Sequence, residues 1–454
     1  MSINPNLIRA IRFGYGLRPG DDLPGGPEDM LAALRGPDRS AADWPIAGFD
    51  LRGDEARILG DMRKARREKQ PGAEAAYKTA ANHARDLALG DFRRSIIRAV
   101  TAKDMFRERL VRFWADHFAI SAKGKGLATV TTSYVEDAIR PYVTGRFSDL
   151  LKAAVLHPVM LIYLDQILSI GPNSTIGKAR DRGLNENLAR EILELHTLGV
   201  GGAYTQKDVR QFAELLTGLF YNFRTGFKFR TRAAEPGAEE VLGQLYGGAR
   251  AGLEDINAAL DDLALHPDTA RHIARKLAVH FVADEPEEPL VAALAGAYTA
   301  SQGDLLVVYE ALLTHPLAQR LPLQKVKQPF DFIATSLRAL AVDPQRLDQM
   351  SRRDTRTQLL LPMQVMGQAW EAPPGPDGWP EAQEDWVTAQ GLAARVQWAL
   401  LAAGLFASDK EPSTFARTAL GDLAPTSLVR TVGFAESRLE GVALVLASPE
   451  FNRR

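Results

Sequence analysis

The chain has 454 residues, of which 46% are hydrophobic and 24% charged, proportions typical of a folded globular protein rather than a disordered or low-complexity chain. Its 55 basic and 56 acidic residues give a formal net charge of −1, so the total charge gives no reason to expect nucleic-acid binding. Because there is no cysteine, disulfides, cysteine-ligated zinc, iron–sulfur clusters and thiol nucleophiles are excluded.

The N-terminal residues lack the continuous apolar segment of a secretory signal, and no stretch approaches the roughly 18 apolar residues of a membrane span. We therefore expect no membrane span and, for the chain as written, a cytoplasmic location. The alternative is a periplasmic location, reached by co-export with a partner or after removal of a signal. The sequence does not indicate an oligomeric state.

Residues 1–91 form the first predicted region. Glycine and proline recur up to Asp50, and a charged run at 63–69 is followed by an alanine-rich stretch at 72–89. Proline interrupts helices, so Pro71 separates the two stretches. We expect two solvent-exposed charged helices here.

Residues 92–345 form the second predicted region, a helical core, because apolar residues recur there mostly at helical spacing. Between 219 and 230, aromatic residues instead alternate with polar ones around Thr225 and Gly226, which predicts a β-hairpin. The sequence therefore predicts an all-α fold, a large multi-helix domain with one small β-hairpin.

Three histidines, His157, His266 and His315, each precede a proline at a predicted junction between helices. Proline favours the first turn of a helix, and histidine at the end of the preceding helix can interact with its dipole. We interpret the three as helix-corner residues, because each has the same local explanation. The alternative is a set of three metal ligands.

Two predicted helices carry histidine among their core residues. In segment 104–118, His117 shares one face with Phe113 and Trp114, so it is either a core histidine with a satisfied hydrogen bond or a partly desolvated base or ligand. Segment 271–281 combines three basic residues with two histidines. We interpret it as a basic amphipathic helix able to receive an acidic partner.

A third helix is predicted between Asn185, a plausible N-cap, and Gly199, a plausible C-terminal stop. Most of its circumference is apolar, and its polar residues form one narrow stripe: Asn187, Arg190, Glu191 and Glu194. A buried helix must satisfy its carboxylates with cations, hydrogen-bond donors or a metal. Two glutamates that share a site raise the pKa of one of them, as a general acid requires.

The polar stripe has two interpretations. In the first, Glu191, Glu194 and His117 are catalytic residues or metal ligands in a buried pocket, and Asn187 and Arg190 bind a small anionic ligand. Carboxylates with one imidazole would suit Mg, Ca, Mn or Fe. In the second, an arginine pairs with the glutamates in an ordinary structural ion network. The sequence leaves open whether the protein is an enzyme.

Residues 346–454 form the third predicted region, which consists of C-terminal helices and a Trp- and Pro-rich loop. Three of the six tryptophans lie between 370 and 386, among several prolines. Large aromatic side chains on a stiff segment suit a lid or a partner-binding surface. A loop fixed to its own domain by these side chains is equally consistent with the sequence.

Several segments resemble the bacterial family called domain of unknown function 1800. They include FWADHFAIS, HPDTARHIARKLAVHF and NENLAREILELHTLGVGGAYTQ, the last being long and specific. The likeness runs from about Arg12 to Arg454. It implies no particular reaction.

The resemblance also implies a partner, because such proteins are often encoded beside a sulfatase-like family of secreted proteins. The alternative to a ligand pocket is therefore a non-enzymatic role in assembly or escort of a sulfatase-like exported protein. The charged helices at 55–89 and the tryptophan-containing loop would then be the contact surfaces.

Overall fold

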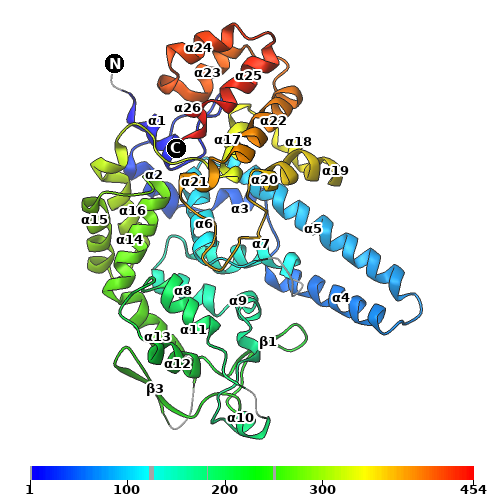
Figure 1. The fold of residues 1–454 in the computed structure, drawn as a ribbon, viewed down its shortest axis with the longest axis vertical. Coiled ribbons are helices and arrows are strands. Elements are labelled where there is room, and N and C mark those ends of the chain that lie inside the picture. The colour runs from blue at the N-terminus through cyan, green and yellow to red at the C-terminus, as the bar shows by residue number, and fades with distance from the viewer. Residues whose placement is uncertain (1–2, 122–126, 181–182, 249–251) are drawn as a thin grey trace.

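Helices account for most of the structure, a computed structural model that describes residues 3–121, 127–180, 183–248 and 252–454 (Figure 1). Within these residues the strands form two small two-stranded antiparallel sheets. The predicted all-α class with a small β-hairpin is therefore confirmed. Among the same residues, a helix with the length and apolarity of a membrane span is not found.

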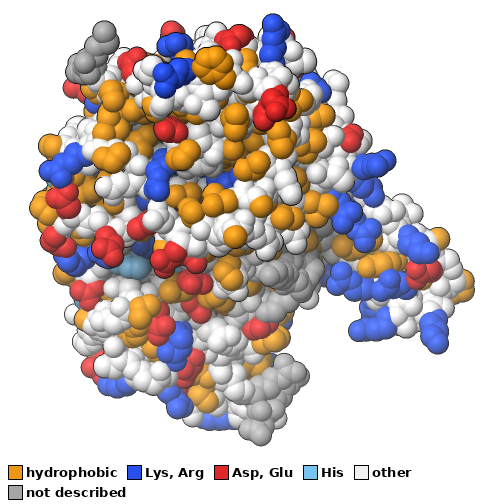
Figure 2. Space-filling view, turned by 45° about the horizontal axis from the view of Figure 1, so that its top comes forward, with side chains coloured by type: hydrophobic (Ala, Val, Ile, Leu, Met, Phe, Trp, Pro, Cys, Tyr) orange, Lys and Arg blue, Asp and Glu red, His pale blue; other side chains and the backbone are white. Residues whose placement is uncertain are grey.

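The N-terminal helices are α1 (Pro5–Arg12), α2 (Pro27–Arg35), α3 (Arg39–Asp43), α4 (Phe49–Arg67) and α5 (Ala73–Thr101). Helices α4 and α5 pack side by side and project from the body of the molecule as an arm (Figure 1). The arm buries small side chains such as Ala81 and Ala84. Lysine and arginine side chains gather on its surface (Figure 2). The two charged helices predicted on either side of Pro71 are present.

The central region begins with α6 (Met105–His117), which starts where the Asp104 side chain accepts a hydrogen bond from the Arg107 backbone N–H. Shorter helices follow: α7 (Thr131–Tyr134), α8 (Phe147–Val155), α9 (Pro158–Tyr163), α10 (Thr175–Arg180), α11 (Asn187–Glu191) and α12 (Gln206–Leu215). The 3-10 turns are η1 (Leu127–Thr129), η3 (Arg140–Tyr142) and η4 (Gln166–Leu168), and the π-helical turns are η2 (Val135–Ile139) and η5 (Ile192–His196).

The predicted hairpin consists of β1 (Leu219–Asn222) and β2 (Gly226–Phe229), with Leu219 opposite Phe229. Gly226 has a φ of 71°, a conformation that glycine adopts without strain. A second hairpin, β3 (Gly237–Val241) and β4 (Gln244–Gly248), was not predicted. Its sequence, rich in glycine and glutamate, lacks the aromatic alternation that marks the first hairpin.

Next come α13 (Leu253–Leu265), α14 (Pro267–Phe281), α15 (Glu288–Ser301), α16 (Leu305–Thr314) and the 3-10 turn η6 (Pro316–Gln319). The C-terminal region contains α17 (Pro329–Ala339), α18 (Pro344–Asp348), α19 (Arg352–Asp354), the π turn η7 (Thr355–Leu360), α20 (Leu361–Val365), α21 (Gln383–Trp386), α22 (Ala389–Phe406), α23 (Pro412–Leu420), the 3-10 turn η8 (Gly421–Leu423), α24 (Thr426–Gly433), α25 (Arg438–Ala447) and α26 (Pro449–Asn452).

The interpretation of His157, His266 and His315 as helix-corner residues is confirmed, with a different local mechanism. Each is the N-cap of the helix that begins at the following proline, and its Nδ1 accepts a hydrogen bond from a backbone N–H two residues on. The distances are 3.2, 3.1 and 3.2 Å. The imidazoles thus cap the following helix rather than meeting the dipole of the preceding one.

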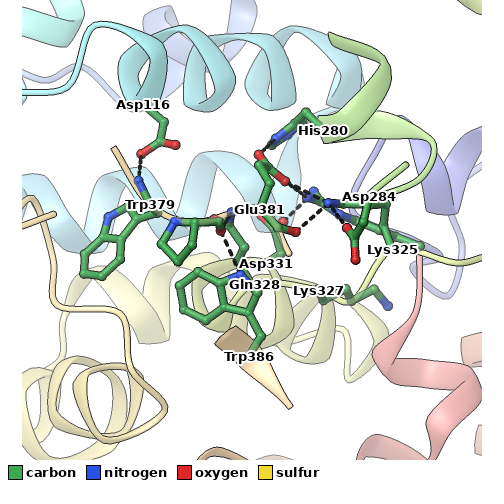
Figure 3. A network of polar contacts seen from close by, with 12 residues as sticks. Asp116, His280, Asp284, Lys325, Lys327, Gln328, Asp331, Trp379, Glu381 and Trp386 are labelled. Carbon is green, nitrogen blue, oxygen red and sulfur yellow. Dashed lines mark hydrogen bonds and ion pairs between the residues drawn. The ribbon is translucent and has the colours of Figure 1, made fainter. Parts of the chain in front are cut away.

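Two hydrophobic clusters make up the core. The first is centred on α6, α8, α11 and α13–α16 and includes Trp114 and Leu277. The second joins the end of α5 to the C-terminal helices and includes Phe92, Leu337 and Trp398. Polar side chains collect near α6 and α14, where the segment between α20 and α21 crosses the molecule (Figure 3). The domain boundaries drawn from the sequence stay a prediction.

Candidate functional site

Helices α6 and α14 bring polar side chains toward each other along most of their length. On α14 the spacing of four residues puts His272, Lys276 and His280 on one face. Arg109 of α6 contacts the last turn of α14, where its Nη2 lies 2.9 Å from Nε2 of His280. We call this layer, together with the loop residues that cover it, the polar seam.

The loop between α20 and α21 covers the polar seam. Oδ1 of Asp116, on α6, accepts a hydrogen bond of 2.9 Å from the backbone N–H of Trp379 (Figure 3). A Cβ at Gly378, which has a φ of 87°, would lie 2.5 Å from the Asp116 carbonyl oxygen, so this approach requires glycine. Nε1 of Trp386 donates to the Pro380 carbonyl at 2.9 Å. The tryptophan-containing loop is thus fixed to its own domain.

Glu381 of this loop is fully paired. It contacts Nδ1 of His280, and its Oε2 lies 3.1 Å from Nζ of Lys325, which also pairs with Asp284 (Figure 3). Burial alone would raise the pKa of Glu381, but His280 and Lys325 outweigh it and lower that pKa to about 2. Glu381 therefore stays ionised and ties the loop to α14.

A second paired group lies beside Glu381. Asp331 of α17 accepts from Nη1 of Arg109 and, at 2.7 Å, from Nη1 of Arg454. The side chains of both arginines are 1% exposed and that of Asp331 is 8% exposed. Each of these charges has an opposite charge in contact, and Nη2 of Arg454 also lies 4.0 Å from Oε2 of Glu381. The group thus joins α6, α17 and Arg454 through buried ion pairs.

The middle of the polar seam is different, because Lys276 makes no hydrogen bond or ion pair within the described part of the chain. Burial lowers the pKa of Lys276, and Asp116, Glu381 and Asp377 are the carboxylates that oppose this effect. Burial also raises the pKa of Asp116 to about 7, against the hydrogen bond from Trp379. A cation without a partner therefore lies beside a carboxyl group that titrates near neutral pH.

Three histidines flank Lys276. Nε2 of His117 is 3.2 Å from the His196 carbonyl, and Nδ1 of His196 is 3.1 Å from the His117 carbonyl. Nε2 of His272 is 2.9 Å from the Leu195 carbonyl. Because a carbonyl accepts, each contacting nitrogen carries the hydrogen. The other nitrogens of His117 and His196 are buried without a partner, and burial lowers the pKa of His196 to about 3. The His196 ring is therefore neutral at physiological pH.

In the predicted polar stripe, Arg190 and Glu194 form an ion pair, whereas Glu191 does not take part in it. Asn187 is exposed, and Arg190 pairs with Glu186 at 3.2 Å and with Glu194 at 3.1 Å. The ion-pair interpretation of the stripe is therefore correct for Glu194. The helix passes from α11 into the π turn η5 directly after Glu191, so a regular α-helical wheel does not describe it.

Glu191 has no ion-pair partner among the residues that the structure describes. It is partly buried, and burial raises its pKa to about 7, with further contributions from the charges of Glu194 and Asp377. Asp377 is also a neighbour of Lys276. Glu191 thus lies at the outer end of the polar seam, next to the loop that covers it.

His117 lies with Lys276 and the other histidines rather than with the glutamates. In the described ranges, no three histidine, aspartate or glutamate side chains are arranged to hold a metal ion. The structure therefore does not bring Glu191, Glu194 and His117 together as the metal site that the sequence suggested.

Asp116, Asp377 and Glu381 were not predicted from the sequence as site residues, and Lys276 was predicted to belong to a basic amphipathic helix. The repeat of His272, Lys276 and His280 at every fourth position was a usable signal for a polar helix face. The covering residues carried no such signal, because they lie about a hundred or more residues away in an irregular loop.

Three of the segments that carry the family resemblance, 113–121, 185–206 and 266–281, contribute to this layer. No curated protein matches the chain, and no solved structure matches it. The family described as protein of unknown function (DUF1800) matches residues 10–453, nearly the whole chain. The chain therefore belongs to the DUF1800 family.

Proposed function

We propose that the chain binds a small anionic ligand at Lys276, in the middle of the polar seam. The observation that carries this proposal is a partly buried lysine without a hydrogen bond or ion pair in the described residues. Withdrawing an ammonium group from water is unfavourable unless an opposite charge compensates it. An anion beneath the loop would supply that charge.

The groups around Lys276 suit proton exchange with such a ligand. Asp116 has a pKa of about 7, so near neutral pH its carboxyl group is present in both protonation states and can donate or accept a proton. Glu191 has a pKa of about 7 at the outer end of the layer. We therefore assign Asp116 and Glu191, rather than Glu191 and Glu194, as the candidate acid–base pair.

The test is the effect of simple anions on thermal stability. Phosphate, sulfate, acetate and citrate, each at millimolar concentration, are added separately to the wild type, to Lys276→Met and to the control Lys152→Met. Lys152 is another partly buried lysine, but it pairs with Asp261. A ligand raises Tm by binding the folded state. We expect at least one anion to raise Tm of the wild type and the control but not of Lys276→Met.

Equal shifts in all three proteins would contradict the proposal. Metal analysis gives a second contradictory outcome. If purified wild type contained stoichiometric Mg, Ca, Mn or Fe, and Glu191→Gln and Glu194→Gln lost it, the site would be a metal centre rather than an anion site.

A second candidate function is assembly with, or escort of, a sulfatase-like partner, and the projecting arm favours it. Between residues 63 and 78 the arm carries six basic and two acidic residues, although the whole chain has a net charge of −1. A helical hairpin that stands off the body adds little to the core, so its charged tip suits contact with an acidic protein. An exported partner would carry the chain to the periplasm.

Co-purification with a sulfatase-like protein tests this role. We expect association at micromolar concentration that weakens in Arg63→Glu/Arg67→Glu and at high salt. The control Arg35→Glu/Arg417→Glu changes charge equally, away from the arm. No association at micromolar concentration, or equal weakening in both double variants, would exclude the arm as the contact surface.

A further inference from the structure

An open groove of about 1370 Å³ lies beside residues 382–384, where the covering loop runs into α21. Its walls come from five places: Asp284 and Glu285 after α14, the segment 321–324, the start of α21, the end of η8, and α26 with the residue after it. Small-molecule sites commonly have volumes of about 300–1000 Å³. The size and openness of this groove therefore suit a chain segment better than a compact ligand.

Part of the groove lining is apolar. Leu321, Pro322, Leu323, Leu423 and Pro449 line it, and Leu321 is 38% exposed. The backbone N–H and carbonyl of Leu323 make no hydrogen bond within the described part of the chain. Backbone groups without a partner in a groove wall can hydrogen-bond to the backbone of a bound peptide.

Another part of the lining is acidic. Asp284 is compensated by Lys325 and by the Gln383 backbone N–H at 2.9 Å. Glu285, Glu384 and Glu450 have no ion pair in the described residues. The single arginine of the wall, Arg453, is occupied by the Gln324 carbonyl and by Oε1 of Gln383. Three uncompensated carboxylates therefore face the groove with no free cation beside them.

From this charge complementarity we propose that the groove binds an extended peptide segment in which lysine or arginine alternates with apolar residues. Such a segment places basic side chains against the three glutamates and apolar side chains against Leu321 and Leu423, since side chains of an extended chain alternate in direction. The sign of the charge disfavours nucleic acid and anionic membrane surfaces. This site is separate from Lys276 and does not depend on the anion proposal.

Fluorescence anisotropy with labelled peptides tests the groove in the full chain. The probes are a nine-residue peptide that alternates arginine with valine and the same peptide with glutamate in place of arginine. We expect the basic peptide to bind at micromolar concentration and the acidic peptide not to bind. Replacing Glu285, Glu384 and Glu450 together with glutamine should weaken binding at least tenfold. The control replaces Glu254, Glu310 and Glu436, which do not line the groove.

A second variant distinguishes binding of the peptide in the groove from non-specific attraction between opposite charges. Leu321→Glu adds an acidic group but removes apolar surface. The proposal predicts weaker binding of the basic peptide, whereas non-specific attraction predicts tighter binding. Tighter binding by Leu321→Glu, or equal weakening by the two triple variants, would overturn the proposal. Self-association of the wild type that the three groove substitutions abolish would also overturn it, because the occupant would then be the basic arm of another copy.

Discussion

The two parts of the polar seam differ in how their charges are compensated. At one end Asp331 and Glu381 each contact two basic side chains. In the middle and at the outer end, Lys276 and Glu191 have no such contact within the described residues. Both parts belong to the same layer, so burial alone does not explain the difference. Paired charges fix the covering loop and Arg454, whereas the unpaired charges lie where we propose that a ligand binds.

The largest expected effect follows from breaking the paired end. Asp331→Asn removes the charge that compensates Arg109 and Arg454, and it leaves two guanidinium groups buried. We expect a loss of about 3–5 kcal/mol in the free energy of unfolding, measured by urea denaturation. Asp385→Asn, at an exposed position, is the control and should change stability by less than about 0.5 kcal/mol. A small loss in Asp331→Asn would mean that the paired end is not structural.

The next effect depends on pH. The pKa of Glu381 is about 2 in the folded protein, so its contribution to stability is complete above its ordinary pKa of 4.5 and is lost as the pH falls toward 2. We expect Glu381→Gln to be less stable than the wild type by about 3 kcal/mol at pH 7. The difference should shrink between pH 4.5 and 2. Urea denaturation at several pH values measures it, and a difference independent of pH would contradict the pairing.

At the outer end the pH dependence has the opposite sign. The pKa of Glu191 is raised to about 7, so the neutral form is favoured by folding, and stability is lost as the pH rises from 4.5 to 7. Glu191→Gln should therefore become more stable relative to the wild type over this range, by less than about 1 kcal/mol because Glu191 is partly exposed. Glu310→Gln, an exposed position, should show no such trend. No relative gain between pH 4.5 and 7, or a relative loss as the pH rises toward 4.5, would show that Glu191 is paired.

The smallest effect is expected for Arg190, whose side chain is 38% exposed. Arg190→Met breaks the contacts with Glu186 and Glu194, but surface ion pairs contribute only about 0–1 kcal/mol. We expect urea denaturation to detect a loss within that range, reduced further at high salt. A loss above about 2 kcal/mol would make this pair part of the structural network.

The features predicted correctly from the sequence are local ones. The hairpin around Gly226 and the helix corners at His157, His266 and His315 each depend on a few consecutive residues. The alternation of aromatic and polar residues, or a proline at the next position, was sufficient to predict them. Helical spacing over long stretches was likewise sufficient for the fold class.

The polar seam could not be predicted in the same way, because its contacts join distant residues. Arg109 and Asp331 are 222 positions apart, and Asp116 meets the backbone of Trp379 across 263 positions. The π turn after Glu191 also changes which side chains share a face, so a regular helical wheel misjudged the glutamate stripe. The helical spacing drew attention to Glu191 but gave no signal for its neighbours in the layer.

The most direct test compares two lysines of the polar seam in one experiment. Lys325 contacts Asp284 and Glu381, whereas Lys276 has no ion pair among the described residues. The free energy of unfolding in urea at pH 7 is measured for Lys325→Met and Lys276→Met without added anion. We predict a loss of about 3 kcal/mol or more for Lys325→Met and no loss, or a gain, for Lys276→Met. An equal loss in both variants would show that Lys276 serves the fold rather than a ligand.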